Sequence, residues 1–282
     1  MQVIERLAEL DGAFDAVLCD IWGVVHGGGQ VFAPVPPLLR ALREQGIPVA
    51  LLSNVPRASA VMPQMLLRHG LSEDAYDAVV TSGDVTRSEL ARRAPGPVHR
   101  LGRENDTSLW QGLGLEFSAL GPARFVAIAG LRTGEHPDDY LPALRAASVR
   151  DLELVCANPD IQVPDGDTLI WTAGSVAQRY ALLGGRVIAL GKPHQAIYQR
   201  ARTVLEHAAG RPLDPRRILA IGDGISTDLR GANRSGLLSL LVATGLNKDS
   251  LLGASGQVDP GRVDEALTRA GATADYVMAT LA

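Results

Sequence analysis

The stretch AVLCDIWGVVH, residues 16–26, begins with a four-residue apolar run that leads directly into Asp20. A run this short and this apolar is typical of a parallel strand that is buried on both faces. Seven more runs of this kind follow, at residues 49–52, 78–81, 125–129, 152–157, 187–190, 218–221 and 238–243. The chain is therefore expected to build a sheet from buried strands.

Segments with apolar residues at helical spacing lie between these runs. The clearest are residues 36–46, 59–70, 175–185 and 194–210, and each ends at or near a glycine, as helices often do. Strands that alternate with helices indicate βα units. The sequence thus predicts the α/β class, with a doubly wound, mostly parallel, Rossmann-like core sheet.

Composition narrows the range of functions and partners. Of 282 residues, 46% are apolar and 21% are charged, and 31 acidic against 27 basic residues give a formal charge of −4. No stripe of basic residues offers a surface to nucleic acid. No apolar run reaches the roughly 20 residues that span a bilayer, and the N-terminal residues lack a signal-peptide pattern. We therefore expect a cytoplasmic protein without nucleic acid or membrane as a partner, and with Cys19 and Cys156 buried in the core.

Polar residues follow several of the predicted strands. Asp20 ends the first run, Ser53 and Asn54 follow the second, and a glycine precedes both Lys192 and Asp223 after two later runs. Ligands bind at the carboxyl ends of the strands in an open parallel sheet, so these residues are expected to converge. With Asp228, the set contains carboxylates, a hydroxyl and an ammonium. Such groups suit a hard cation and a phosphate.

Four segments, in order, resemble the motifs of the haloacid dehalogenase-like phosphohydrolase superfamily. They are DIWGVVH (20–26), LLSN (51–54), GKPH (191–194) and GDGISTD (222–228). The segments are most similar to those of the class IIA subfamily, which includes p-nitrophenyl, sugar-phosphate, nucleotide and pyridoxal phosphatases. The segment ANPD (157–160) adds to this resemblance. Each motif alone is weak, whereas four in order at strand ends are specific.

The resemblance implies a magnesium-dependent phosphatase with Asp20 as the nucleophile. Attack by this carboxylate on phosphorus would form an aspartyl-phosphate and divide the hydrolysis into two easier displacements. In family terms, Mg²⁺ would be held by Asp20, Asp223 and the main-chain carbonyl of Trp22, because a carbonyl ligand does not depend on the side chain.

The remaining motif residues receive roles in binding the substrate phosphate. By the same resemblance, the Ser53 hydroxyl and the Asn54 main-chain N–H would donate to phosphate oxygens. Lys192 would supply positive charge to the phosphate and the nucleophile. Asp228 would orient Lys192 or a metal-bound water. Each of these residues taken alone also has a structural interpretation, as a turn, a helix cap or a solvated lysine.

Trp22 departs from the family pattern. Most phosphatases of the superfamily have an aspartate two residues after the nucleophile, which protonates the leaving group and then activates water. Indole transfers no proton, and such acid-base assistance is worth about 10²- to 10⁴-fold in rate. Three explanations are open: another group acts as the acid and base, the leaving group needs little protonation, or turnover is slow. His26 and His136 are the nearest titratable candidates in the sequence.

Two other functions remain open at this point. Haloacid dehalogenases of the superfamily also carry an aromatic residue at this position, since halide departs without a proton. These enzymes use no magnesium and lack the Gly-Asp pair found here at residues 222 and 223, which favours phosphate. The third possibility is a regulatory protein that binds a phosphorylated metabolite with little catalysis.

The domain organisation is expected to be a core with an insertion. We assign residues 1–85 and 186–282 to the catalytic core and 86–185 to an inserted α/β cap. The Pro- and Gly-containing segment 91–100 is the best candidate for a join. In class IIA relatives the cap covers the active site, and by this resemblance Asn158 and Asp160 would contact the substrate, a small phosphorylated metabolite. Family relatives often dimerise through the cap, so a homodimer is also expected.

Overall fold

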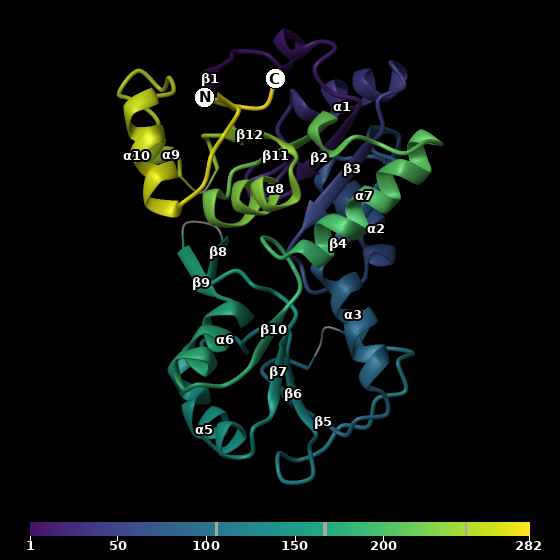
Figure 1. Cartoon of the computed structure of the whole chain (residues 1–282), viewed down its shortest axis with the longest axis vertical. Coiled ribbons are helices and arrows are strands. Elements are labelled where there is room, and N and C mark those ends of the chain that lie inside the picture. Colours follow the sequence, from purple (N-terminus) through teal and green to yellow (C-terminus); the bar gives the residue numbers. More distant parts are fainter. Residues whose placement is uncertain (105–106, 166–167, 246) are drawn as a thin grey trace. The chain divides into compact units, whose positions relative to one another are not determined.

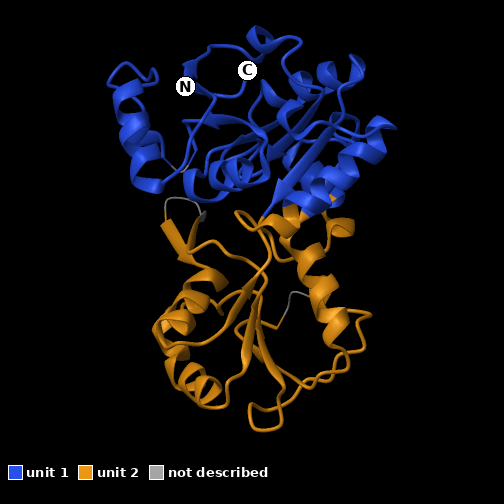
Figure 2. Cartoon of the chain, viewed as in Figure 1, with its two compact units in different colours: residues 1–53, 63–80, 198–282 blue, residues 54–62, 81–197 orange. Residues whose placement is uncertain are grey.

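In the computed structural model, the chain divides into two compact units. Unit 1 comprises residues 1–53, 63–80 and 198–282, and unit 2 comprises residues 54–62 and 81–197 (Figure 2). The structure describes the whole chain except residues 105–106, 166–167 and 246. All of the predicted cap, residues 86–185, falls in the range of unit 2, and the catalytic and capping roles stay predictions.

Unit 1 is built on a seven-stranded sheet in the order β1-β13-β12-β11-β2-β3-β4 (Figure 1). Its strands are β1 (Gln2–Val3), β2 (Ala16–Asp20), β3 (Val49–Ser53), β4 (Ala78–Thr81), β11 (Ile218–Gly222), β12 (Leu238–Val242) and β13 (Tyr276–Met278). Strand β2 lies at the centre and pairs in parallel with both β11 and β3. Every residue of these three strands is buried, which explains their unbroken apolar sequences.

All or most of the residues of six helices belong to unit 1. These helices are α1 (Val35–Glu44), α2 (Met62–His69), α7 (Gln195–Ala209), α8 (Arg230–Ser235), α9 (Lys248–Leu251) and α10 (Pro260–Ala270). The ends of helix α10 follow from its local sequence, because the Asp259 side chain accepts the N–H groups of Gly261 and Arg262. It ends at Gly271, which adopts a left-handed φ of 59°.

Unit 2 contains a four-stranded parallel sheet in the order β10-β7-β6-β5. Its strands are β5 (Val98–Leu101), β6 (Phe125–Ile128), β7 (Glu153–Cys156) and β10 (Val187–Ala189), and a separate antiparallel hairpin pairs β8 (Gln162–Asp165) with β9 (Thr168–Trp171). Its helices are α3 (Ser82–Arg93), α4 (Thr107–Trp110), α5 (Leu141–Val149) and α6 (Ala173–Leu182). Helices α5 and α6 share one apolar cluster with the sheet, built around Leu144, Leu154 and Tyr180.

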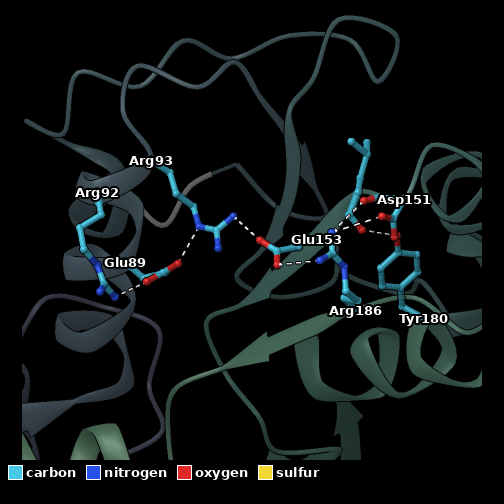
Figure 3. A network of polar contacts seen from close by, with 8 residues as sticks. Glu89, Arg92, Arg93, Asp151, Glu153, Tyr180 and Arg186 are labelled. Atoms are coloured by element: carbon cyan, nitrogen blue, oxygen red, sulfur yellow. Dashed lines mark hydrogen bonds and ion pairs between the residues drawn. The ribbon is translucent and has the colours of Figure 1, made fainter.

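A chain of ion pairs ties helix α3 of unit 2 to the sheet (Figure 3). The Arg93 guanidinium donates to Glu89 at 2.7 Å and also contacts Glu153 on β7 at 2.8 Å. Arg186, directly before β10, contacts the other oxygen of Glu153 at 3.7 Å, and the Tyr180 hydroxyl donates to the main chain of Leu152 at 2.5 Å. Glu89 is nearly buried, and the two guanidinium groups of Arg92 and Arg93 compensate its charge.

The expected α/β architecture is confirmed, including all eight predicted strands and all four predicted helices. The sequence analysis missed β1, β5, β8, β9 and β13, which are short or carry polar residues. Segment 91–100 was wrongly expected to join the substructures. It lies inside unit 2 and connects α3 to β5.

Cys19 and Cys156 are both buried and form no disulfide with each other, as expected for small core residues. Burial raises the pKa of the Cys156 thiol to about 12, which makes this thiol unreactive at neutral pH. Across the described residues, none of the helices combines the length and the apolar character needed to cross a bilayer.

Candidate active site

Three buried carboxylates of unit 1 meet at the carboxyl edge of the central strands. Asp20 is the last residue of β2, Asp223 follows β11 directly, and Asp228 lies in a single π-helical turn, η6 (Ile225–Leu229). One oxygen from each side chain lies within 4.8 Å of one from each of the others. Their exposed fractions are only 5%, 2% and 6%. The convergence expected from the strand ends is therefore observed for all three.

The electrostatics of this carboxylate triad favour a bound cation. Like charges at this spacing repel one another, and burial raises the cost because water screens them poorly. Local donors hold two of the groups. Asp20 accepts the N–H of Ile21 at 2.8 Å, while one oxygen of Asp228 accepts the Gly224 N–H and the Thr227 hydroxyl, both at 3.2 Å. An all-oxygen donor set with this much negative charge fits a hard divalent cation such as Mg²⁺.

Neighbouring residues fix the main chain around the triad. The Asn247 amide donates to the main-chain oxygen of Asp223 at 2.9 Å, and the Tyr198 hydroxyl donates to that of Asp228 at 3.1 Å. Two glycines also pack against the Asp223 carboxylate. A Cβ atom at Gly23 or Gly245 would lie 2.0 or 1.9 Å from its Oδ2. The Gly245 contact was not expected from the sequence, since the loop after β12 carries no recognisable motif.

We predict that Gly245→Ala lowers kcat/KM by about 10²-fold, because the added methyl group must displace the Asp223 carboxylate and small displacements of a catalytic group have effects of this size. The matched control is Gly29→Ala, where the new methyl group meets open space. Phosphate release and circular dichroism should be measured for both variants. Full activity in a folded Gly245→Ala protein would show that the close approach of this loop is not required.

Ser53 and Trp22 occupy the same edge of the unit 1 sheet. Ser53 ends β3 and is buried, and β3 pairs with β2 so that Leu52 lies opposite Asp20. Trp22 lies two residues beyond Asp20 and has 37% of its surface exposed. Unit 1 thus brings together five of the predicted site residues, which are Asp20, Trp22, Ser53, Asp223 and Asp228.

The other predicted site residues form a hydrogen-bonded cluster in unit 2, centred on Asn54. The Asn54 side chain accepts the main-chain N–H of Lys192 at 2.7 Å and donates to the Lys192 carbonyl at 3.1 Å. The same amide donates to Asp160 at 2.8 Å. Lys192 is 4% exposed, so the alternative of a solvated lysine is wrong. Asn54 therefore fixes the main chain of the loop that carries the lysine.

Close packing supports this cluster. Gly191 has no room for a side chain, because a Cβ atom there would lie 2.4 Å from the Asn54 side-chain oxygen and 2.7 Å from Pro159. The Ser82 hydroxyl lies within hydrogen-bond distance of two main-chain carbonyl oxygens. These are the oxygens of Asn54, at 2.7 Å, and Ala157, at 2.6 Å. Close packing thus explains why residue 191 of the GKPH segment is glycine, which the motif alone did not reveal.

Asn158 and Asp160 form the turn that follows β7. The Asn158 side-chain oxygen accepts the N–H of Asp160 at 3.0 Å, and this hydrogen bond forms an Asx-turn. Asp160 in turn accepts from Asn54 and is therefore part of the cluster around Lys192. Contacts of either residue with a substrate stay predictions.

The two histidines considered as proton donors have structural partners. His26 is buried, and its Nδ1 accepts the N–H of Gly28 at 3.1 Å. Burial, with His69 nearby, lowers the pKa of His26 to about 4. His136 caps a helical turn in unit 2, where its Nδ1 accepts the Asp138 N–H at 3.3 Å, and its ring lies edge-on to Trp171.

Comparison with known proteins identifies the family. A family model for haloacid dehalogenase-like hydrolases matches residues 17–116, and a second, for HAD-hydrolase-like domains, matches residues 189–281. A crystal structure of a haloacid dehalogenase-like family hydrolase from Brucella suis 1330 is 38% identical, covers 99% of this chain and 100% of that chain, and superposes with a TM-score of 0.86. The chain belongs to the haloacid dehalogenase-like hydrolase family.

Curated relatives point to the phosphatases within this family. Chronophin from Rattus norvegicus is 28% identical over 86% of this chain and 80% of its own length. D-Glycerol 3-phosphate phosphatase from Mycobacterium tuberculosis is 28% identical over 83% of this chain and 64% of its own length. The predicted family and the predicted enzyme class, a phosphatase of this superfamily, are confirmed.

Proposed function

We propose that this protein hydrolyses small phosphate monoesters with Mg²⁺ and through an aspartyl-phosphate on Asp20. The observation that carries the proposal is the buried carboxylate triad at the strand ends of unit 1. Three anionic groups so close together and so poorly hydrated are costly to the fold unless a cation is bound. Such an arrangement is more readily explained by function than by stability.

In this proposal Asp20, Asp223 and the main-chain carbonyl of Trp22 hold Mg²⁺. The bound ion supplies positive charge that neutralises the substrate phosphate and so permits an anionic nucleophile to approach it. The hydrogen bond from the Ile21 N–H to Asp20 Oδ1 helps to orient the carboxylate for attack on phosphorus. Asp228, held by Gly224 and Thr227, acts as a positioning residue behind the ligands.

Ser53, Asn54 and Lys192 are proposed to bind the phosphate oxygens. Ser53 would donate through its hydroxyl and Asn54 through its main-chain N–H, as the family resemblance implies. The Asn54 side chain is engaged with the main chain of Lys192, so its proposed second task is to hold the lysine loop in place. Lys192 would stabilise the negative charge that develops on the transferred phosphoryl group.

The substrate is proposed to be a small phosphorylated metabolite, since one relative is named as a phosphatase of a small phosphate monoester, D-glycerol 3-phosphate. Contacts from Asn158 and Asp160 would contribute to its recognition. The predicted homodimer and cytoplasmic location remain proposals. The dehalogenase alternative is less favoured, because it leaves the buried Asp223 and Asp228 carboxylates without a task.

Removal of the metal tests this function directly. We expect the purified protein to release phosphate from p-nitrophenyl phosphate when Mg²⁺ is present, and to lose this activity in excess EDTA. Activity should return when Mg²⁺ is added in excess of the chelator. Haloacids should be assayed in parallel. Phosphate release that EDTA does not diminish would contradict the metal assignment, and halide release without metal would favour the dehalogenase.

A further inference from the structure

Trp22 follows the proposed nucleophile closely in the sequence and lies in a hydrogen-bonded turn. It lies two residues after Asp20, at the start of a tight turn in which the Val25 N–H donates to the Ile21 carbonyl at 2.9 Å and the Gly23 N–H donates to the His26 carbonyl at 2.9 Å. Ile21 is buried, whereas 37% of Trp22 is exposed. The turn therefore leaves Trp22 partly exposed, two residues after the buried Asp20.

A stack of aromatic rings supports this indole from within unit 1. The centroids of the Trp22 and His26 rings are 5.0 Å apart, and His26 stacks almost flat on His69, at 4.8 Å and 7°. The His69 Nδ1 is held at 2.7 Å from the carbonyl of Gly29. Three side chains from α2 and the loop after β2 thus form one supporting column.

The glycine-rich loop is shaped around the same ring. Gly28 has a left-handed φ of 102°, and a Cβ atom there would lie 2.9 Å from the indole Cη2 of Trp22. The Gly28 N–H donates to His26 Nδ1, so the loop also fixes the supporting imidazole. Any side chain at position 28 would push the indole away. The loop and the stack together determine where the indole lies.

The same geometry removes His26 as a proton donor to a substrate. His26 is only 5% exposed, its ring contacts the rings of Trp22 and His69, and its Nδ1 accepts the Gly28 N–H. The carboxylates that lie with Asp20 in the described part of unit 1 are Asp223 and Asp228, whose proposed roles are metal binding and positioning. Position 22 itself offers only an indole.

We propose, on the basis of the proposed function, that Trp22 is a specificity-determining residue that restricts the enzyme to phosphates of leaving groups that depart as stable anions. These are aryl, enol and acyl phosphates. In the first step the Asp20 oxygen forms a bond to phosphorus, the bond from phosphorus to the leaving oxygen breaks, and its electron pair stays on that oxygen. No proton is delivered. An aryloxide, enolate or carboxylate tolerates this charge, whereas an alkoxide does not.

The exposed indole adds selectivity of its own. An aromatic surface packs well against a planar, unsaturated leaving group. A sugar alcohol would place hydroxyl groups against the same apolar ring without hydrogen-bond partners there. Both effects act in the same direction and favour the planar anion over the alcohol.

The test compares two substrates of equal size, phenyl phosphate and cyclohexyl phosphate, with Mg²⁺. Wild-type kcat/KM should be at least about 10²-fold higher for the phenyl ester, beyond the difference shown by a control phosphatase that has the usual second aspartate. Trp22→Asp should reduce this ratio by raising hydrolysis of the cyclohexyl ester. Trp22→Phe, which is aromatic and has no proton to give, should retain the ratio. Folding and Mg²⁺ affinity are measured for each variant.

The possible outcomes distinguish a failure of this inference from a failure of the proposed phosphatase function. A wild-type ratio no larger than that of the control phosphatase overturns the inference and leaves the phosphatase assignment standing. Absence of Mg²⁺-dependent phosphate release from either ester contradicts the proposed function itself. If Trp22→Asp does not fold, a series of para-substituted phenyl phosphates on the wild type serves instead, since kcat/KM must fall steeply as the leaving phenol becomes less acidic.

Discussion

Asp20→Asn is expected to lower phosphatase activity by at least about 10³-fold, because removal of an enzyme nucleophile leaves only binding and electrostatic contributions to catalysis. The amide that replaces the carboxylate keeps its size and can still accept the Ile21 N–H. It lacks the negative charge that attacks phosphorus and that binds a divalent cation. A large loss of activity with a nearly unchanged fold is therefore the expected result.

The measurement is kcat/KM for p-nitrophenyl phosphate, with the thermal unfolding midpoint as a check on folding. Asp264→Asn is the matched control, since Asp264 is exposed on α10 of the same unit. Stability is a second measurement, because the three carboxylates of the triad repel one another. Without Mg²⁺, Asp20→Asn should be at least as stable as the wild type, because it removes one of three buried like charges. An Asp20→Asn protein with ordinary activity would exclude Asp20 as the nucleophile.

Lys192→Ala is expected to reduce kcat by about 10²- to 10³-fold, the loss typical when one preorganised group that stabilises the transition state is removed. Lys192 is one of only two lysines in the chain, and it is buried, whereas Lys248 is exposed on α9. A buried ammonium is costly to maintain. Its retention at a strand-end loop points to a task at the phosphate rather than to solubility.

The substitution should spare the loop itself. The Asn54 side chain accepts the N–H of residue 192 and donates to its carbonyl, so alanine at this position keeps both hydrogen bonds. Asn54→Ala removes these bonds and should lower activity with Lys192 still present. Lys248→Ala is the matched control and should behave as wild type in activity and unfolding. Full activity of a folded Lys192→Ala protein would show that the ammonium has no role in catalysis.

Strand ends explain why so much of the candidate site could be predicted from the sequence. The runs before Asp20, Ser53 and Asp223 are apolar throughout, and their carboxyl ends must meet in a parallel sheet. The structure places Asp20 and Asp223 together with Asp228 as this reasoning requires. The apolar pattern of the strands and the position of the polar residues at their ends were enough for this prediction, because both follow from burial of the strands.

Contacts that depend on the tertiary fold could not be predicted in this way. His69 supports Trp22 through His26 although it lies on a helix 43 positions after His26. Gly245 touches Asp223 from a different loop, and only the three-dimensional structure reveals that a methyl group there would collide. Segment 91–100 had the composition of a linker, yet it turns within unit 2, because proline and glycine mark turns as readily as joins.

Trapping the covalent intermediate tests the central claim most directly. With Trp22 at the position of the usual base, water should attack the aspartyl-phosphate slowly, so the phosphoenzyme should accumulate during turnover of an activated ester. Enzyme mixed with p-nitrophenyl phosphate and Mg²⁺, quenched in acid and digested, should carry one phosphoryl group on Asp20 in peptide mass spectra. The label should be absent with EDTA and in Asp20→Asn. Phosphate release without any labelled enzyme, or with the label on another residue, would contradict the account.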